Sequence, residues 1–163
     1  MKQIAELHRA VFKYVLFFFT MIMFLSCNKD NDFPTCYEHF IFGSYACECA
    51  GQCAWLYQLT NDELVIGDGE SCMPDHYTYA GTPLSKDKFE IAHRVVDELP
   101  DTLLENSEDR FGCPDCHDQG GYYLELRTKS STRKWSIDTD ADDLPEFLMD
   151  YQKTIHDVLI ALQ

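Results

Sequence analysis

Residues 143–162 read DLPEFLMDYQKTIHDVLIAL, and this stretch decides the fold class. Its apolar side chains recur at steps of three or four, with two adjacent pairs, which predicts a helix with one buried face. Asp143 and Glu146 have the spacing of a capping box, so we expect the helix to begin there. The predicted buried face consists of Leu144, Phe147, Leu148, Tyr151, Ile155, Val158, Leu159 and Leu162.

Upstream of this helix, β-forming segments predict the sheet that the buried face would cover. Residues 54–59 and 63–66 are separated by a short polar turn, as are residues 122–127 and 134–138. Each pair predicts a hairpin, and residues 37–46 predict a first strand. The best core candidates share faces of the second hairpin: Leu124, Leu126, Trp135 and Ile137.

A second helix is predicted between the hairpins. Ser85 can cap it and Pro100 ends it. Two hairpins and two helices in this order favour an α+β fold, in which an antiparallel sheet from two hairpins is packed against a C-terminal amphipathic helix and a second, central helix. The apolar positions of the central helix are Phe89, Ala92, Val96 and Leu99.

The first 32 residues predict an export signal that ends at a lipid-carrying cysteine. Three basic residues precede an apolar run of eleven residues, 15–25. That run is shorter than the roughly 20 residues a membrane-spanning helix needs. The expected organisation is a lipoprotein signal peptide over 1–26, a lipid-anchored tether over 27–35 and a single α+β domain over 36–163.

The segment Phe24-Leu25-Ser26-Cys27 resembles the lipobox of bacterial lipoproteins. The resemblance implies cleavage before Cys27 and acylation of its thiol with chains such as palmitate. The polar string 28–32 resembles the surface-export signal of lipoproteins from Bacteroides-like bacteria. Together these implications give a protein of the cell envelope, bound to the outer membrane through its N-terminal lipid and exposed at the cell surface.

The charge of the chain narrows the choice of partners. The sequence has 13 Lys and Arg against 28 Asp and Glu, and 10 against 27 from Cys27 onward. A body this acidic repels nucleic acid phosphates and anionic lipid headgroups. We therefore expect no nucleic acid partner, and we expect membrane attachment to come from the lipid.

The predicted domain contains most of the cysteines of the chain. Seven remain once Cys27 is set aside for lipid, and in an oxidising compartment disulfides are expected. Three bridges among seven cysteines allow 105 arrangements, so the connectivity stays open. Cys47 and Cys49 are not expected to bond each other, whereas Cys113 and Cys116 can close across a turn. The disulfide candidates are Cys36, Cys47, Cys49, Cys53, Cys72, Cys113 and Cys116.

The segment Cys113-Pro-Asp-Cys116-His117 allows several interpretations. It satisfies the Cys-x-x-Cys-His pattern for covalent haem attachment, with His117 as the axial ligand. A structural disulfide in a turn is the competing interpretation. Thioredoxin-like redox chemistry is a third, but it favours a cysteine pair at a helix N-terminus, and Asp115 would disfavour the reactive thiolate.

A second cysteine cluster spans residues 47–53, with His39 upstream. Thiolates at this density could hold zinc or copper, and residues 113–117 could complete the ligand set. The alternative is a set of disulfides that link this loop to Cys36, Cys72 or the later pair.

The segment Asp138-Thr-Asp140-Ala-Asp142 begins like a calcium loop. The pattern then fails, because Asp143 stands where glycine is required and Met149 where a bidentate Glu is required. A solvated acidic turn that caps the following helix is expected instead. Sequence signatures of serine hydrolases, zinc proteases and phosphate-binding loops are absent from the sequence.

These features favour a non-catalytic binding or interaction module for an unknown protein or small-molecule ligand, without a cofactor. Tyr77, Tyr79 and Tyr122 are candidates for its contact surface, or alternatively pack within the sheet and loops. The other functional hypothesis is a metal-binding (zinc or copper) or c-type haem protein that uses Cys113, Cys116 and His117.

A wider resemblance covers most of the chain after Cys27. The lipobox, the Cys-x-Cys-x₃-Cys cluster near the first hairpin and the segment Gly112-Cys-Pro-Asp-Cys-x-x-x-Gly-Gly before the second one are similar to small uncharacterised envelope lipoproteins of Bacteroides-like bacteria. This resemblance implies no particular activity.

Overall fold

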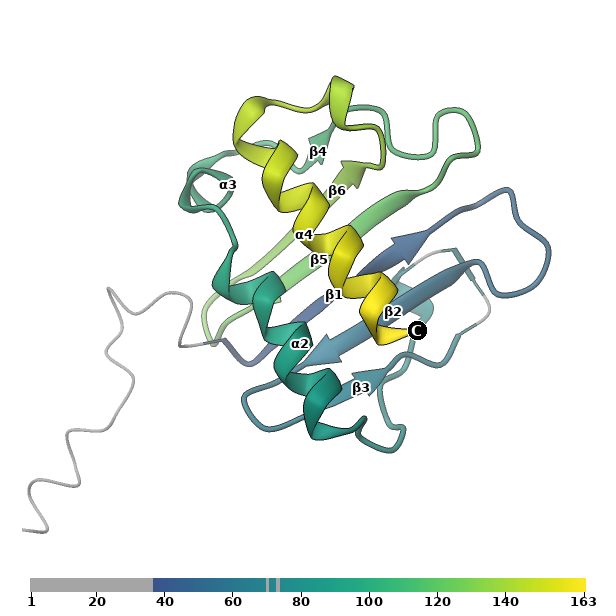
Figure 1. The fold of residues 1–163 in the computed structure, drawn as a ribbon, viewed down its shortest axis with the longest axis vertical. Coiled ribbons are helices and arrows are strands. Elements are labelled where there is room, and N and C mark those ends of the chain that lie inside the picture. Colours follow the sequence, from purple (N-terminus) through teal and green to yellow (C-terminus); the bar gives the residue numbers. More distant parts are fainter. Residues whose placement is uncertain (1–36, 70, 73) are drawn as a thin grey trace, which may run out of the picture. The chain divides into compact units, whose positions relative to one another are not determined.

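A computed structural model describes residues 37–69, 71–72 and 74–163, which belong to one unit of the chain (Figure 1). The predicted signal peptide, the tether and Cys36 lie outside the described residues. Within the described part of the chain, no helix combines the length and the apolar character that crossing a membrane requires.

The strands form one sheet in the order β3-β2-β1-β5-β6-β4 (Figure 1). Both predicted hairpins are present, as β2–β3 and β5–β6, and β1 lies between them in antiparallel pairing with β2 and β5. The short β4 was not predicted, and it pairs with β6 in parallel. The strands are β1 (His39–Tyr45), β2 (Ala54–Leu59), β3 (Leu64–Ile66), β4 (Arg110–Phe111), β5 (Gly121–Arg127) and β6 (Thr132–Asp138).

The longer helices, α2 (Lys86–Asp97) and α4 (Glu146–Leu162), lie side by side over one face of the sheet (Figure 1). The short α3 (Asp101–Glu105) follows α2. Ser85 caps α2 as predicted, because its hydroxyl accepts a hydrogen bond from the backbone N–H of Lys88 at 3.5 Å. The chain therefore has the predicted α+β fold, with a mostly antiparallel sheet.

The start of α4 differs from the prediction. Its N-cap residue is Pro145, which makes no side-chain cap, and Asp143 ends a separate 3₁₀ turn, η2 (Ala141–Asp143). The capping box is therefore wrong. Proline disfavours helical geometry at the residue before it, so the helix begins only after Pro145.

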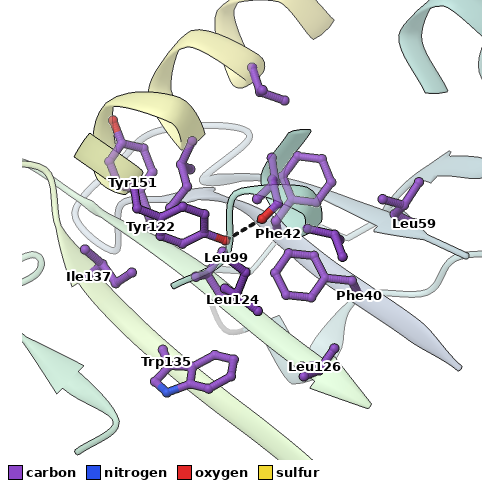
Figure 2. Packing of buried hydrophobic residues seen from close by; sticks show 14 of the residues in the cluster. Phe40, Phe42, Leu59, Leu99, Tyr122, Leu124, Leu126, Trp135, Ile137 and Tyr151 are labelled. Carbon is purple, nitrogen blue, oxygen red and sulfur yellow. Dashed lines mark hydrogen bonds between the residues drawn. The ribbon is translucent and has the colours of Figure 1, made fainter. Parts of the chain in front are cut away.

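The main core lies between the sheet and the helices. Figure 2 shows side chains of the strands, among them Phe42, Leu124 and Trp135, together with Tyr151 of α4. The four predicted core residues of the second hairpin are all buried. A smaller apolar cluster lies on the opposite face, where Tyr77 of the segment 67–81, directly after the 3₁₀ turn η1 (Pro74–His76), covers the sheet. That cluster consists of Ile41, Ala54, Leu56, Tyr77 and Tyr123.

Candidate functional site

All six cysteines of the described residues are paired, as Cys47–Cys72, Cys49–Cys53 and Cys113–Cys116, with Cα–Cα distances of 4.9, 5.6 and 5.5 Å. Disulfide formation is thus confirmed for these six. Cys47 and Cys49 bond other partners, and Cys113 closes on Cys116, as predicted. The bond from Cys49 to Cys53 lies within its own loop, which the sequence did not predict.

The disulfides gather at one end of the sheet. Residues 46–53 connect β1 to β2 and residues 112–120 lead into β5; we call these two segments the cysteine loops. They are neighbours because Tyr45 at the end of β1 pairs with Gly121 at the start of β5. The Asp115 carboxylate joins them directly, since its Oδ2 accepts a hydrogen bond from the backbone N–H of Cys47 at 2.9 Å.

The cysteine loop 112–120 has an unusual backbone. Four of its residues have positive φ: Gly112 (71°), Asp115 (61°), Asp118 (60°) and Gly120 (77°). Aspartate tolerates this region better than most residues, because its short side chain can bond the local backbone. Asp115 does so, with Oδ1 accepting from the N–H of Gly120 at 3.1 Å.

Asp138, at the end of β6, holds the start of this loop. Its side chain is 1 % exposed, and its oxygens accept hydrogen bonds from the backbone N–H groups of Cys113 at 2.7 Å and Asp140 at 2.9 Å. Gln119 donates to the same carboxylate at 3.3 Å and to the Cys113 carbonyl at 2.9 Å. Asp138 therefore organises a loop, whereas the sequence predicted a solvated turn that caps α4.

The charge state of Asp138 follows from these contacts. Burial by itself would raise the pKa of the carboxyl group. The hydrogen bonds from Asp140, Cys113, Gln119 and Thr139 outweigh it and hold the pKa below its usual value. The carboxyl group is thus ionised at neutral pH, and the carboxylate accepts hydrogen bonds from backbone donors.

The candidate metal and haem ligands are arranged differently from a metal centre. The sulfur atoms of Cys113 and Cys116 are bonded to each other in a disulfide, which leaves no thiolate to bind a metal while the bond is intact. His117 is exposed, and its backbone N–H donates to the Gln119 side chain at 2.7 Å. In the described residues, no group of three or more His, Cys, Asp or Glu side chains is placed to hold a metal ion.

His39 is separated from the cysteine loops by the length of β1. Its Nε2 lies 3.7 Å from the Glu125 carboxylate on the face opposite the helices. Glu125 is 7 % exposed, accepts a hydrogen bond from the Tyr123 hydroxyl at 2.7 Å and lies 3.4 Å from the Lys134 ammonium. Lys134 also contacts Asp75 at 2.5 Å, which helps to fasten the segment 67–81 to the sheet.

The predicted tyrosine contact surface is wrong, and the alternative of packing holds. Tyr77 and Tyr122 are 7 % and 5 % exposed, and Tyr79 is half-buried. Hydrogen bonds explain part of this burial: the Tyr77 hydroxyl donates to the Ala54 carbonyl at 3.1 Å, and the Tyr122 hydroxyl lies 3.0 Å from His156 Nδ1. Among the described aromatic side chains, the exposed one is Trp55, at 45 %.

Comparisons of this chain with protein-family models, curated proteins and solved structures found no match.

The most site-like feature of the described residues is therefore the pair of cysteine loops. Most residues of these loops are exposed to solvent, yet disulfides and side-chain hydrogen bonds hold the loop backbone in place. Sequence reasoning identified the cysteines but missed Asp115 and Asp138 as the groups that hold the loop. Two signals could have pointed to them: Gly112 and Gly120 bracket the motif, and Asp138 ends a strand otherwise rich in core residues.

Proposed function

We propose that this chain is a lipid-anchored protein of the cell envelope whose domain is a non-catalytic binding module, with the cysteine loops as its recognition surface. The observation that carries the proposal is the combination of exposure and fixation in these loops. Both lie on the surface, and the link from Asp115 to the Cys47 N–H makes them one continuous structure.

Fixed loops favour binding for an energetic reason. A flexible loop loses conformational entropy when a partner orders it, and this loss weakens the affinity. Loops that disulfides hold in place before binding avoid much of that loss. Binding residues are often found on loops that a rigid scaffold positions, as the sheet does here.

The charges of the loops indicate the kind of partner. The loops carry three acidic residues, Glu48, Asp115 and Asp118, and one histidine, His117. Arg110 lies next to the loops, and its guanidinium donates a hydrogen bond to the Pro114 carbonyl at 2.9 Å. A protein or small molecule with positive charge suits this surface. Nucleic acid does not suit it, because phosphates would be repelled.

The two buried carboxylates of the described residues, Asp138 and Glu125, are unsuited to general acid–base catalysis. A general acid or base needs a side chain free to exchange a proton with substrate. Asp138 is committed to backbone N–H groups, and Glu125 to Tyr123, Lys134 and His39.

The anchor is supported by the sequence before the domain. The lipobox-like segment that ends at Cys27 and the polar string after it favour export, acylation and display on the outer membrane. An oxidising envelope compartment agrees with the three disulfides of the described residues.

Site-specific photo-crosslinking in the cells that make the protein tests the binding role. A photoreactive amino acid replaces Glu48 or His117 in the cysteine loops, or Lys153 on α4 as the matched exposed control. We expect adducts, measured as a mass increase of the intact protein, from the loop positions only. Adducts confined to the α4 position, or no adduct from either loop, would contradict the proposal.

A further inference from the structure

The indole ring of Trp55 lies at the start of β2, directly after the cysteine loop 46–53. Its neighbours in the strand, Ala54 and Leu56, are buried on the face opposite the helices, so Trp55 points to the face that the helices cover. Trp55 is nonetheless 45 % exposed, whereas Trp135 on the same face is 1 % exposed. The start of β2 is therefore open to solvent.

Two residues flank Trp55 on neighbouring strands. Ser44 of β1 pairs with it on one side. On the other side, the β2–β3 register continues beyond the end of β3, because the N–H of Gly67 donates to the Leu56 carbonyl at 2.7 Å. One further step along the chain places Asp68 opposite Trp55.

The glycines on either side of Asp68 indicate the direction of its side chain. A Cβ atom on Gly67 or Gly69 would come within 2.9 Å of the Tyr77 ring, which covers the face opposite the helices. Side chains alternate along this bridged, extended segment, so the carboxylate of Asp68 projects to the other face, beside Trp55. Asp68 is exposed, as Trp55 is.

An exposed indole next to a carboxylate suits a cation. The face of the indole ring attracts positive charge through its quadrupole, and the carboxylate adds an opposite charge. The hydroxyl group of Ser44 offers a further hydrogen-bond acceptor at the border of the site. The lysines at the start of α2 already have partners within the helices, so the cation would come from another molecule.

Arginine suits this arrangement better than lysine. Its planar guanidinium can stack on a ring while its fork of N–H donors meets a carboxylate, whereas the lysine ammonium is a compact point charge. The domain already contains an arginine–tryptophan contact, because the guanidinium carbon of Arg133 lies 5.3 Å from the centroid of the Trp135 ring. The acidic surface of the domain would also attract a basic partner.

We propose that Trp55 and Asp68 form a binding site for an arginine side chain of a partner protein, with the guanidinium stacked on the indole and paired with the carboxylate. This inference rests on the proposed binding role. It extends the recognition surface from the cysteine loops to the start of β2, and it names the chemical group that the site takes.

Nuclear magnetic resonance of the natively processed protein in detergent micelles tests the site. The probe is a peptide of arginines alternating with glycines, and its matched forms carry lysine or citrulline, the uncharged analogue of arginine. We expect the arginine peptide to shift the indole N–H signal of Trp55 saturably and to leave that of buried Trp135 in place. The lysine peptide should bind about two- to fivefold more weakly, and the citrulline peptide should cause no shift.

Two variants that each remove one exposed carboxylate sharpen the test. Asp68→Asn should weaken binding of the arginine peptide about threefold. Asp62→Asn, in the turn at the other end of the β2–β3 hairpin, should leave binding unchanged. Because both positions are exposed, the fold should survive, which the melting temperature checks.

Three outcomes would overturn the site. They are equal shifts of the Trp55 signal with the arginine and citrulline peptides, equal losses of affinity in the two variants, and a lysine peptide that binds at least as tightly as the arginine peptide. Photo-crosslinked adducts from the cysteine loops would in those cases still support the binding role, so the two proposals fail separately.

Discussion

Asp138 shows how one buried side chain supports an exposed loop. Its carboxylate accepts a hydrogen bond from the backbone N–H of Cys113 at the start of the cysteine loop 112–120, next to the Cys113–Cys116 disulfide. Gly112 lies directly beside it, because a Cβ atom on Gly112 would come within 2.6 Å of the Asp138 Cβ. The close approach of these two residues fixes where the loop leaves the sheet.

Replacing Asp138 tests this role. In Asp138→Asn the amide loses the charge and points a donor at other donors, so we expect a loss of about 1.5–3 kcal/mol in the free energy of unfolding. Exposed Asp118→Asn is the matched control, expected within about 0.5 kcal/mol of the parent because Asn also tolerates positive φ. Equal losses in the two variants, measured by urea denaturation, would contradict the role.

The same residue predicts a pH dependence. The pKa of Asp138 is lowered in the folded state, so its contribution to stability is present above the unfolded pKa and is lost as the pH falls through the folded pKa. Below about pH 4, stability should therefore fall more steeply in the parent than in Asp138→Asn. Parallel acid limbs in melting curves of the two proteins would show that the carboxylate carries no such contribution.

Alanine substitutions at two glycines distinguish the cost of backbone strain from the cost of a steric clash. Gly112 and Gly51 both have positive φ, at 71° and 106°, but a Cβ on Gly51 would meet nothing within 4 Å. Gly51→Ala should cost about 1 kcal/mol from strain, and Gly112→Ala clearly more, because Asp138 must move as well. Thermal unfolding ranks the two, and a larger loss for Gly51→Ala would argue against the close approach.

At the scale of elements, periodicity predicted what periodicity can show. Helix α4 and both hairpins lie at nearly the predicted positions. Their apolar patterns could be recognised because the helix and the sheet each bury one face against the other. β4 has two residues and pairs in parallel, so no repeating pattern could show it. The burial of Tyr77 and Tyr122 depends on contacts with distant strands and with α4, which local sequence does not encode.

The segment 67–81 offers a matched pair of tyrosines. The Tyr77 hydroxyl caps the Ala54 carbonyl at the start of β2, whereas the buried Tyr79 hydroxyl has no hydrogen-bond partner within the described structure. Tyr77→Phe should cost about 1 kcal/mol, and Tyr79→Phe should be neutral or stabilising, because it removes an unsatisfied group. Denaturant titration measures both, and the reverse order would contradict these contacts.

For the whole molecule, the disulfides differ in what they contribute. Cys47–Cys72 spans a sequence separation of 25 and fastens segment 67–81, whereas Cys113–Cys116 spans 3 within a loop that hydrogen bonds already hold. Loop-closure entropy then predicts losses of about 3–4 kcal/mol for the double serine variant of the first pair and about 2 kcal/mol for the second. Equal unfolding free energies of the two variants would contradict this ranking.

The candidate site could be predicted from the sequence only in part. Spacing alone predicted that Cys113 and Cys116 can close on each other and disfavoured a bond between Cys47 and Cys49, but it left the remaining pairings open. His39 lies near the 47–53 cluster in the sequence, yet β1 carries the chain away from it to the other end of the sheet. Which residues meet was decided by strand order, and strand order is a property of the whole fold.

Intact mass of the natively processed, unreduced protein tests the central claim most directly. We predict a chain that begins at Cys27, carries acyl chains, has six hydrogens fewer than its fully reduced form because of the three disulfides, and holds no porphyrin or stoichiometric metal. A chain that retains residues 1–26, or one with a covalent porphyrin or bound zinc in place of the Cys113–Cys116 disulfide, would contradict a lipid-anchored module with disulfide-fixed loops.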